Sequence, residues 1–135
     1  MITEDYVSFE TAKLLKEKGF DEATNRYYNA QYDQIRTVSD TFMWHWNNEE
    51  FMKRVLMEGA IAIPTLQMAM KWLREVHKLC ISITPQVTDD DGDGGCLWQF
   101  AITSHLEPLS ISLELYEQYE EACEAAIKYC LENLI

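Results

Sequence analysis

The segment DDDGDGG, residues 89–95, carries the side chains best able to bind a cation. Aspartates at loop positions 1, 3 and 5, followed by glycine at position 6, begin an EF-hand calcium loop. With Asp89, Asp91 and Asp93 in those places, position 12 falls on Phe100, which has no carboxylate to complete the site. Because strands rather than helices are expected on both sides, the segment is interpreted as a hairpin tip. We therefore predict no metal ion and no other cofactor.

The four cysteines and three histidines lack the spacing of a zinc site, since the sequence contains no CxxC and no HxxxH. Cys123 and Cys130 are seven residues apart, about 10.5 Å along a helix. That separation is too long for a disulfide and awkward for a single metal ion. We expect reduced thiols that pack as small apolar groups.

Cys96 and His105 are the cysteine–histidine pair considered for nucleophilic catalysis, because such groups need only be close in space. The strand expected between them would hold them about 30 Å apart at 3.3 Å per residue. The motifs GxSxG, GxxxxGK[ST], GxGxxG and HExxH are also absent. No catalytic residue is predicted.

Aromatic residues gather between positions 27 and 46. They are Tyr27, Tyr28, Tyr32, Phe42, Trp44 and Trp46. An exposed surface of this kind is typical of protein binding, and base stacking fits less well because only Arg26 and Arg36 are near to hold phosphates. We favour the alternative that these side chains pack on a buried helix. If the cluster is exposed instead, Trp44 and Trp46 are its candidate interaction residues.

The net charge of −12 is concentrated toward the C-terminus. Residues 1–79 carry 10 basic and 12 acidic side chains, whereas residues 80–135 carry one basic and 11 acidic side chains. Nucleic acids and anionic membranes are disfavoured as partners, because affinity for them comes from Lys and Arg. A basic protein partner is compatible with this charge. The candidate acidic contact residues are Glu117, Glu120, Glu121 and Glu124.

The first part of the chain predicts a helix between residues 8 and 19, a hairpin over 26–46 and a helix between 48 and 59. Alternating aromatic residues place the turn of the hairpin near 38–40. Phe51, Val55 and Leu56 are expected on one side of the second helix. Capping and stop signals mark the helix ends: Ser8, Gly19, Asn48 and Gly59.

The second part predicts a helix over 65–79, strands near 81–84, 98–103 and 109–115, and a final helix over 118–133. On the first of these helices the polar residues form one narrow stripe, so its other faces, Val76 included, should be buried. The stripe consists of Gln67, Lys71, Arg74, Glu75 and Lys78. The chain is therefore predicted to be a single α+β domain over residues 1–135. We expect a mostly antiparallel sheet covered by helices, in the order α-β-β-α and then α-β-β-β-α.

Three segments, FETAKLLKEKGF, IPTLQMAMKWLREVHKL and YEEACEAAIKYCLENLI, resemble a family of small uncharacterised proteins from Bacteroides-type genomes, phages and mobile elements. The resemblance covers nearly the whole chain and implies a cytoplasmic setting. The family supplies no assigned activity and hence no catalytic residue. The N-terminal MITEDYVSFE also lacks the basic and apolar regions of a signal peptide, and no window is apolar enough to span a bilayer.

Three functional hypotheses follow from these observations. The first is a non-catalytic protein-interaction or accessory protein of a phage or mobile element, acting through an exposed apolar or aromatic face, with homodimer formation as an option. The alternative is an acidic nucleic-acid mimic that inhibits a host DNA- or RNA-binding protein, its carboxylates imitating phosphates. The third is an enzyme without a recognisable motif. We favour the first and lean against an enzyme.

Overall fold

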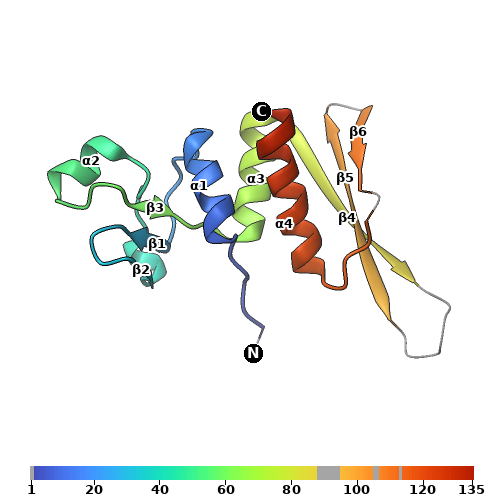
Figure 1. The fold of residues 1–135 in the computed structure, drawn as a ribbon, viewed down its shortest axis with the longest axis horizontal. Coiled ribbons are helices and arrows are strands. Elements are labelled where there is room, and N and C mark those ends of the chain that lie inside the picture. Colours follow the sequence, from blue (N-terminus) through green and yellow to red (C-terminus); the bar gives the residue numbers. More distant parts are fainter. Residues whose placement is uncertain (1, 88–94, 105–106, 113) are drawn as a thin grey trace. The chain divides into compact units, whose positions relative to one another are not determined.

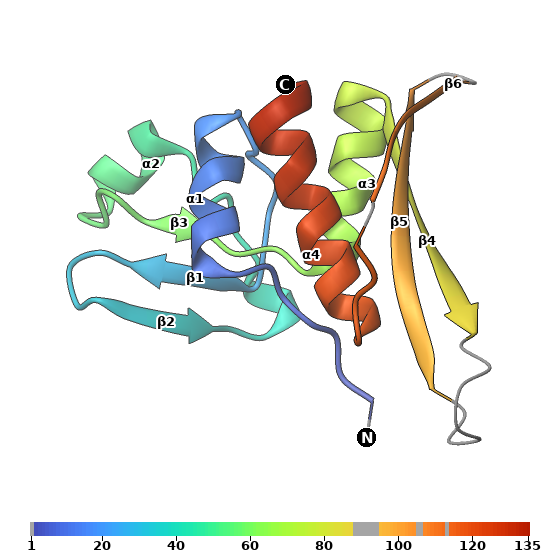
Figure 2. The same cartoon turned by 45° about the vertical axis from the view of Figure 1, so that its right-hand side comes forward.

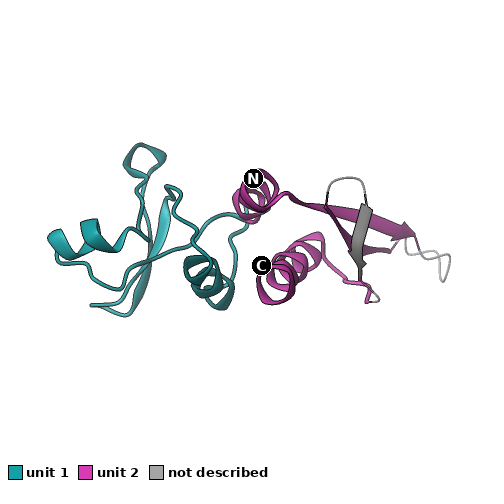
Figure 3. Ribbon diagram, turned by 90° about the horizontal axis from the view of Figure 1, so that it is seen from above, with its two compact units in different colours: residues 1–65 teal, residues 66–135 magenta. Residues whose placement is uncertain are grey.

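The computed structural model describes residues 2–87, 95–104, 107–112 and 114–135, and for residues 107–111 it describes the backbone alone. The described residues form four α-helices and two three-stranded antiparallel sheets (Figure 1). This architecture confirms the predicted α+β class. The chain divides into two compact units, Met1–Thr65 (unit 1) and Leu66–Ile135 (unit 2) (Figure 3). That the two units form one domain stays a prediction.

Unit 1 contains a short sheet in the strand order β2-β1-β3, with α1 packed against β3. Its elements are α1 (Phe9–Glu17), β1 (Arg26–Asn29), β2 (Gln34–Thr37), the 3₁₀ helix η1 (Asp40–Phe42), α2 (Glu49–Arg54) and β3 (Ile61–Ala62). The predicted caps are confirmed. Ser8 Oγ accepts a hydrogen bond from Thr11 N at 3.2 Å, and Asn48 Oδ1 accepts one from Phe51 N at 3.1 Å.

The helices α1 and α2 end in the same hydrogen-bond pattern. In α2 this pattern lies before Gly59, the residue at which the sequence predicted the end of the helix. In α1, Gly19 takes a left-handed φ of 94°, as predicted. In α2, Leu56 takes that conformation with φ 59°, Leu56 N donates to Lys53 O, and Met57 N donates to Met52 O. The helix therefore stops before Gly59. Leu56, expected beside Phe51 and Val55, is turned outward and 83% exposed.

The predicted position of the hairpin turn was wrong. The turn lies at residues 30–33 rather than 38–40. Asn29 faces Gln34 across the turn. The Asn29 side-chain oxygen accepts a hydrogen bond from Gln31 N at 3.0 Å, and Asp33 takes a left-handed φ of 49°. Asx-type turn chemistry thus outweighs the alternation of aromatic residues. The later aromatic residues leave the hairpin, so Phe42 lies in η1 instead of a strand.

Unit 2 has the predicted order α-β-β-β-α, with a sheet in the order β4-β5-β6. Its elements are α3 (Leu66–His77), β4 (Leu79–Val87), β5 (Cys96–Ser104), β6 (Glu107–Ile111), α4 (Tyr119–Tyr129) and the π-helical segment η2 (Cys130–Leu134). Both long helices lie on the same side of the sheet (Figure 2). The predicted hairpin tip, residues 89–95, falls outside the described residues except for its last glycine.

The core of unit 2 lies between this sheet face and the helices. Phe100 and Ile102 on β5 are 5% and 0% exposed, and one face of α4 is buried, with Ala122, Cys123, Ala126 and Ile127. On α3 the polar stripe is exposed as predicted. Val76 is an exception to the expected burial, with 54% of its surface exposed. Val76 lies in the last turn of α3. The chain leaves the helix at Lys78, which takes a φ of 58°, and the last turn of the helix is therefore left uncovered.

Candidate functional site

An apolar groove of about 470 Å³ lies in unit 1. Its lining comes from the end of the hairpin, from η1, from the segment before α2, and from α2 with its C-terminal turn. We call it the apolar groove, and its residues are Val38, Phe42, Trp44, Trp46, Phe51, Met52, Val55 and Met57. No lining side chain is an acid, a base or a nucleophile. The groove can therefore bind apolar groups but offers no group for catalysis.

Trp46 forms the fixed wall of the apolar groove. Its ring stacks on buried Tyr27, with centroids 3.8 Å apart, and its Nε1 donates a hydrogen bond to Thr24 O at 2.7 Å. Both contacts tie the indole to β1 and to the residues just before it. This side chain is half-buried, so its position is set by the fold and not by a ligand.

Trp44 is held by its backbone and leaves much of its ring exposed. Thr24 N donates to Trp44 O at 3.0 Å, and Trp44 N donates to Thr24 O at 3.1 Å. The centroid of its ring lies 5.0 Å from that of Phe51 on α2, and the residue is 43% exposed. A rigid backbone with an accessible aromatic ring is what a binding surface requires.

The other side of the apolar groove is set by the short helix α2. Met52 is 2% exposed and forms the floor, whereas Val55 is 43% exposed at the rim. Phe42, presented by η1, is 70% exposed. Large apolar side chains with this exposure gather at one place, which is unusual for a surface that stays in contact with water.

The aromatic cluster is thus divided between core and surface. Tyr27 is buried and Trp46 is half-buried, but their rings stack on each other within unit 1, so packing of the cluster on the helix over 65–79 stays a prediction. Phe42, Trp44 and Tyr32 are exposed, which agrees with the surface alternative. Val38, Met52 and Met57 line the apolar groove although sequence reasoning did not select them, because scattered Val and Met residues give no signal before the fold joins them.

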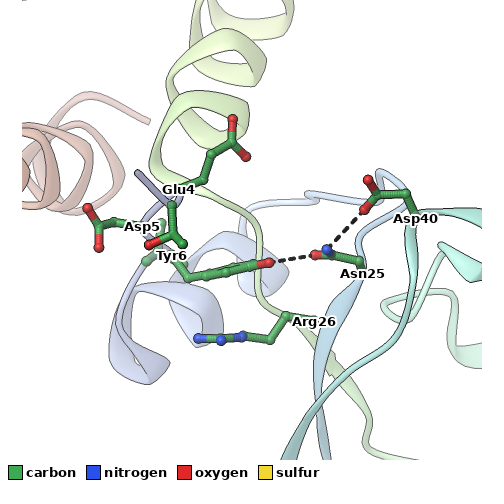
Figure 4. Close-up of a pocket in the computed structure, with 8 residues that line it drawn as sticks. Glu4, Asp5, Tyr6, Asn25, Arg26 and Asp40 are labelled. Carbon is green, nitrogen blue, oxygen red and sulfur yellow. Dashed lines mark hydrogen bonds between the residues drawn. The ribbon is translucent and has the colours of Figure 1, made fainter. Parts of the chain in front are cut away.

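A second, polar hollow in unit 1 encloses about 780 Å³ and is shown in Figure 4. We call it the acidic cleft, and its lining is Thr3, Glu4, Asp5, Tyr6, Val7, Asn25, Arg26 and Asp40. Arg26 lies 3.8 Å from the centroid of the Tyr6 ring. Tyr6 Oη donates to Asn25 Oδ1 at 3.0 Å, and Asn25 Nδ2 donates to Asp40 Oδ1 at 3.2 Å. Three carboxylates against one guanidinium leave this hollow net acidic.

The apolar groove and the acidic cleft share one wall. Asp40 lines the acidic cleft, and Phe42, two residues later in η1, lines the apolar groove. Val38 N also donates to Asn25 O at 2.7 Å, which joins a groove residue to a cleft residue. The two hollows are therefore neighbouring features of one surface of unit 1. Sequence reasoning missed the acidic cleft, whose residues are scattered from position 3 to position 40.

The predicted interaction residues belong to different units. Trp44 and Trp46 lie in unit 1, whereas the four glutamates lie in unit 2 at the start of α4. Glu117, Glu120 and Glu121 are exposed and Glu124 is half-buried. Glu120 and Glu121 lie in the first turn of α4, where a carboxylate stabilises the helix through its dipole, and this gives the two residues a structural role.

Two of the four cysteines, Cys123 and Cys130, are buried in unit 2. Burial raises the pKa of Cys123 to about 11 and that of Cys130 to about 12, so both stay protonated at neutral pH. Cys80 and Cys96 are half-buried. His105, the residue considered as a partner of Cys96, lies outside the described residues, as do Asp89, Asp91 and Asp93. Elsewhere no three His, Cys, Asp or Glu side chains are grouped as metal ligands.

The chain matches no protein-family model, no curated protein and no solved structure. The resemblance to proteins of Bacteroides-type genomes therefore stays a prediction. In the described residues no helix has the length and apolar character needed to cross a membrane.

Proposed function

We propose that this chain is a non-catalytic protein-interaction protein that binds its partner through the apolar groove. The observation that carries the proposal is the exposure of Phe42, Trp44 and Val55 around a floor made by buried Met52. Aromatic residues and Met are enriched in the centres of protein interfaces, where their burial supplies most of the binding energy. A partner that inserts a large apolar side chain would cover the exposed rings.

The charge of the chain indicates the chemistry of the partner segment. The acidic cleft adjoins the apolar groove through η1, and the whole chain carries a net charge of −12. A segment with a Lys or Arg close to its apolar anchor would place the cation beside Asp40. The proposed partner is therefore a protein segment that is both basic and apolar.

Selection of random peptides on the immobilised wild-type chain, followed by calorimetry with a synthetic peptide, tests this function. Peptides that combine an aromatic or aliphatic anchor with Lys or Arg should be enriched. Trp44→Ala should weaken binding at least tenfold, and Tyr32→Ala is the matched control because Tyr32 is 60% exposed but does not line the apolar groove. Equal affinity of the Trp44→Ala and wild-type chains would rule out the apolar groove as the binding site.

An accessory role in a phage or mobile element, within the cytoplasm, is part of this proposal. The resemblance of three segments to proteins of Bacteroides-type phages and mobile elements supports the accessory role. Four cysteines that are all free thiols support a reducing compartment. Fractionation of a native host that carries the gene would test the compartment.

An acidic nucleic-acid mimic is the second candidate. It is favoured by Glu117, Glu120 and Glu121, which are all exposed at the start of α4. Such a protein would bind the basic cleft of a DNA- or RNA-binding protein through these carboxylates and not through the apolar groove. Replacing the glutamates would then abolish binding while Trp44→Ala would leave it intact.

A further inference from the structure

The sheet of unit 2 ends on one side at β4. In an antiparallel sheet, the N–H and C=O groups of successive residues point to alternate sides of the strand. Trp98 and Tyr116 exchange two backbone hydrogen bonds of 2.8 Å, and Phe100 O accepts one from Ser112 N at 2.9 Å. Trp98 and Phe100 therefore direct their backbone groups away from β4.

The register between β4 and β5 then gives the direction of each backbone group of β4. Ile83 lies opposite Phe100, and Pro85 lies opposite Trp98. Because Trp98 and Phe100 do not bond to β4, their opposite residues must direct their own groups outward. The outward residues are Leu79, Ile81, Ile83, Pro85 and Val87. Within the described residues no strand pairs with this edge.

Pro85 protects the C-terminal half of the β4 edge. The N-terminal half, residues 79–83, is unprotected. Proline has no N–H, and an edge position with its nitrogen turned outward is where a sheet tolerates it. Leu79, Ile81 and Ile83 keep both donors and acceptors on the open side. No charged residue occurs from Leu79 to Val87, although the chain as a whole carries a charge of −12. Native edges are commonly protected by charges, and this one has none.

We propose that two copies of this chain pair through this edge, β4 against β4, antiparallel and about a twofold axis. In the proposed register Ile81 faces Ile81 of the second copy, and Leu79 faces Ile83 of the second copy. It is the longest register that keeps Pro85 out of the ladder. Each of the pairs formed by these outward residues exchanges two hydrogen bonds, which joins the two sheets into one.

A second copy suits this edge for two reasons. The strand is uncharged, so two strongly acidic chains can approach there without bringing like charges into contact. Ile81 and Ile83 are half-exposed on the face that the helices cover, and a second β4 would bury them further. A contact that uses the same residues from both copies also closes on itself as a dimer.

Disulfide cross-linking of a Ser82→Cys variant tests the proposed pairing. In the proposed register Ser82 lies opposite Cys80 of the second copy in a pair that is not hydrogen-bonded, with Cα atoms about 4.5 Å apart, which a disulfide can span. Both side chains lie on the sheet face opposite Phe100, so the core is unchanged. Every variant also carries Cys96→Ser, because Cys96 is the other cysteine that is not buried.

Mild oxidation should convert most of the Ser82→Cys chain into a covalent dimer on a non-reducing gel. Two controls should stay monomeric on that gel. The first control carries only Cys96→Ser, so that Cys80 lies opposite Ser82 of the second copy. In the second, Cys80→Ser is combined with Ser82→Cys, so the cysteine at position 82 again faces serine. Sedimentation of the wild-type chain should show a dimer that dissociates on dilution.

Two results would overturn the proposal. One is a Ser82→Cys chain that does not cross-link while the wild type sediments as a monomer at high concentration. The other is cross-linking of a control as strongly as of the test variant, which would show random collision or another register. The proposal concerns unit 2 and is independent of the apolar groove of unit 1, so a Trp44→Ala chain should still cross-link.

Discussion

The indole of Trp46 and the phenol ring of Tyr27 are stacked, with their centroids 3.8 Å apart and their planes 15° apart. Tyr27 is 7% exposed and belongs to β1, so the stack connects the core of unit 1 to the wall of the apolar groove. The neighbouring Trp44 makes no such stack with β1. Two tryptophans that are two residues apart thus have different surroundings: Trp46 is stacked on the core of unit 1, and Trp44 is largely exposed.

Substitution of these tryptophans should separate a role in stability from a role in binding. Trp46→Ala should lower the free energy of unfolding by about 3 kcal/mol, because it removes a large stacked ring. Trp46→Phe should cost about 1 kcal/mol through loss of the hydrogen bond to Thr24. Trp44→Ala should cost less than Trp46→Ala and mainly impair partner binding. Urea melts measure the stability, and a larger loss from Trp44→Ala would contradict this division.

Leu73→Ala and Phe100→Ala should each lower the free energy of unfolding by about 2 to 5 kcal/mol, because each empties a filled position in unit 2. Leu73 is 0% and Phe100 5% exposed. Val76→Ala is the matched control on the same helix as Leu73 and should change stability by about 0.5 kcal/mol or less. Urea unfolding of the three variants provides the comparison. Losses under about 0.5 kcal/mol at both core positions would show that the assigned core is wrong.

Stability should fall as the pH rises above about 9, and the thiols of α4 and η2 should contribute. Burial raises the pKa of Cys123 from 9.0 to about 11, partly opposed by a hydrogen bond with Tyr119, and burial raises the pKa of Cys130 to about 12. Above pH 9 the thiols therefore ionise in the unfolded chain before they ionise in the folded chain, which favours unfolding. Below that pH they have no such effect.

The change to alanine at Cys123 or Cys130 should make the free energy of unfolding fall less steeply between about pH 9 and pH 11. Urea melts under reducing conditions at several pH values measure this slope. Cys80→Ala is the control, because that thiol is half-buried. An unchanged slope in both buried variants would argue against the raised pKa values.

Charge-neutralising variants should distinguish the two candidate functions, because they show which carboxylates cause the dependence of partner association on salt. For a basic partner, raising the salt concentration from about 50 to 500 mM should slow association by an order of magnitude or more. If the apolar groove is the site, Asp40→Asn should slow association, whereas Trp44→Ala should speed dissociation. Changing Glu117, Glu120, Glu121 and Glu124 to Gln should then have little effect. If the chain is a nucleic-acid mimic, those four changes should reproduce the effect of high salt, which stopped-flow kinetics would show.

Sequence alone determined the features that depend on neighbouring residues. Ser8 and Asn48 begin helices because their side chains accept hydrogen bonds from backbone groups three residues later. The strand predicted near 98–103 and the helix predicted over 118–133 were confirmed, because apolar residues recur with the period of a strand in the first segment and of a helix in the second. In each case a few consecutive residues carry all the information.

The tertiary structure decided which apolar side chains are covered. Composition and spacing made Trp44, Trp46 and Val76 equally good candidates for burial, yet Trp46 stacks on Tyr27 while the other two are exposed. The backbone bonds between Thr24 and Trp44 create the apolar groove, and they join residues 20 positions apart. The direction of the β4 backbone groups likewise depends on its register with β5. Contacts of this kind are set by which distant segments pack together, and that is decided by the packing of the whole fold and not by any local pattern.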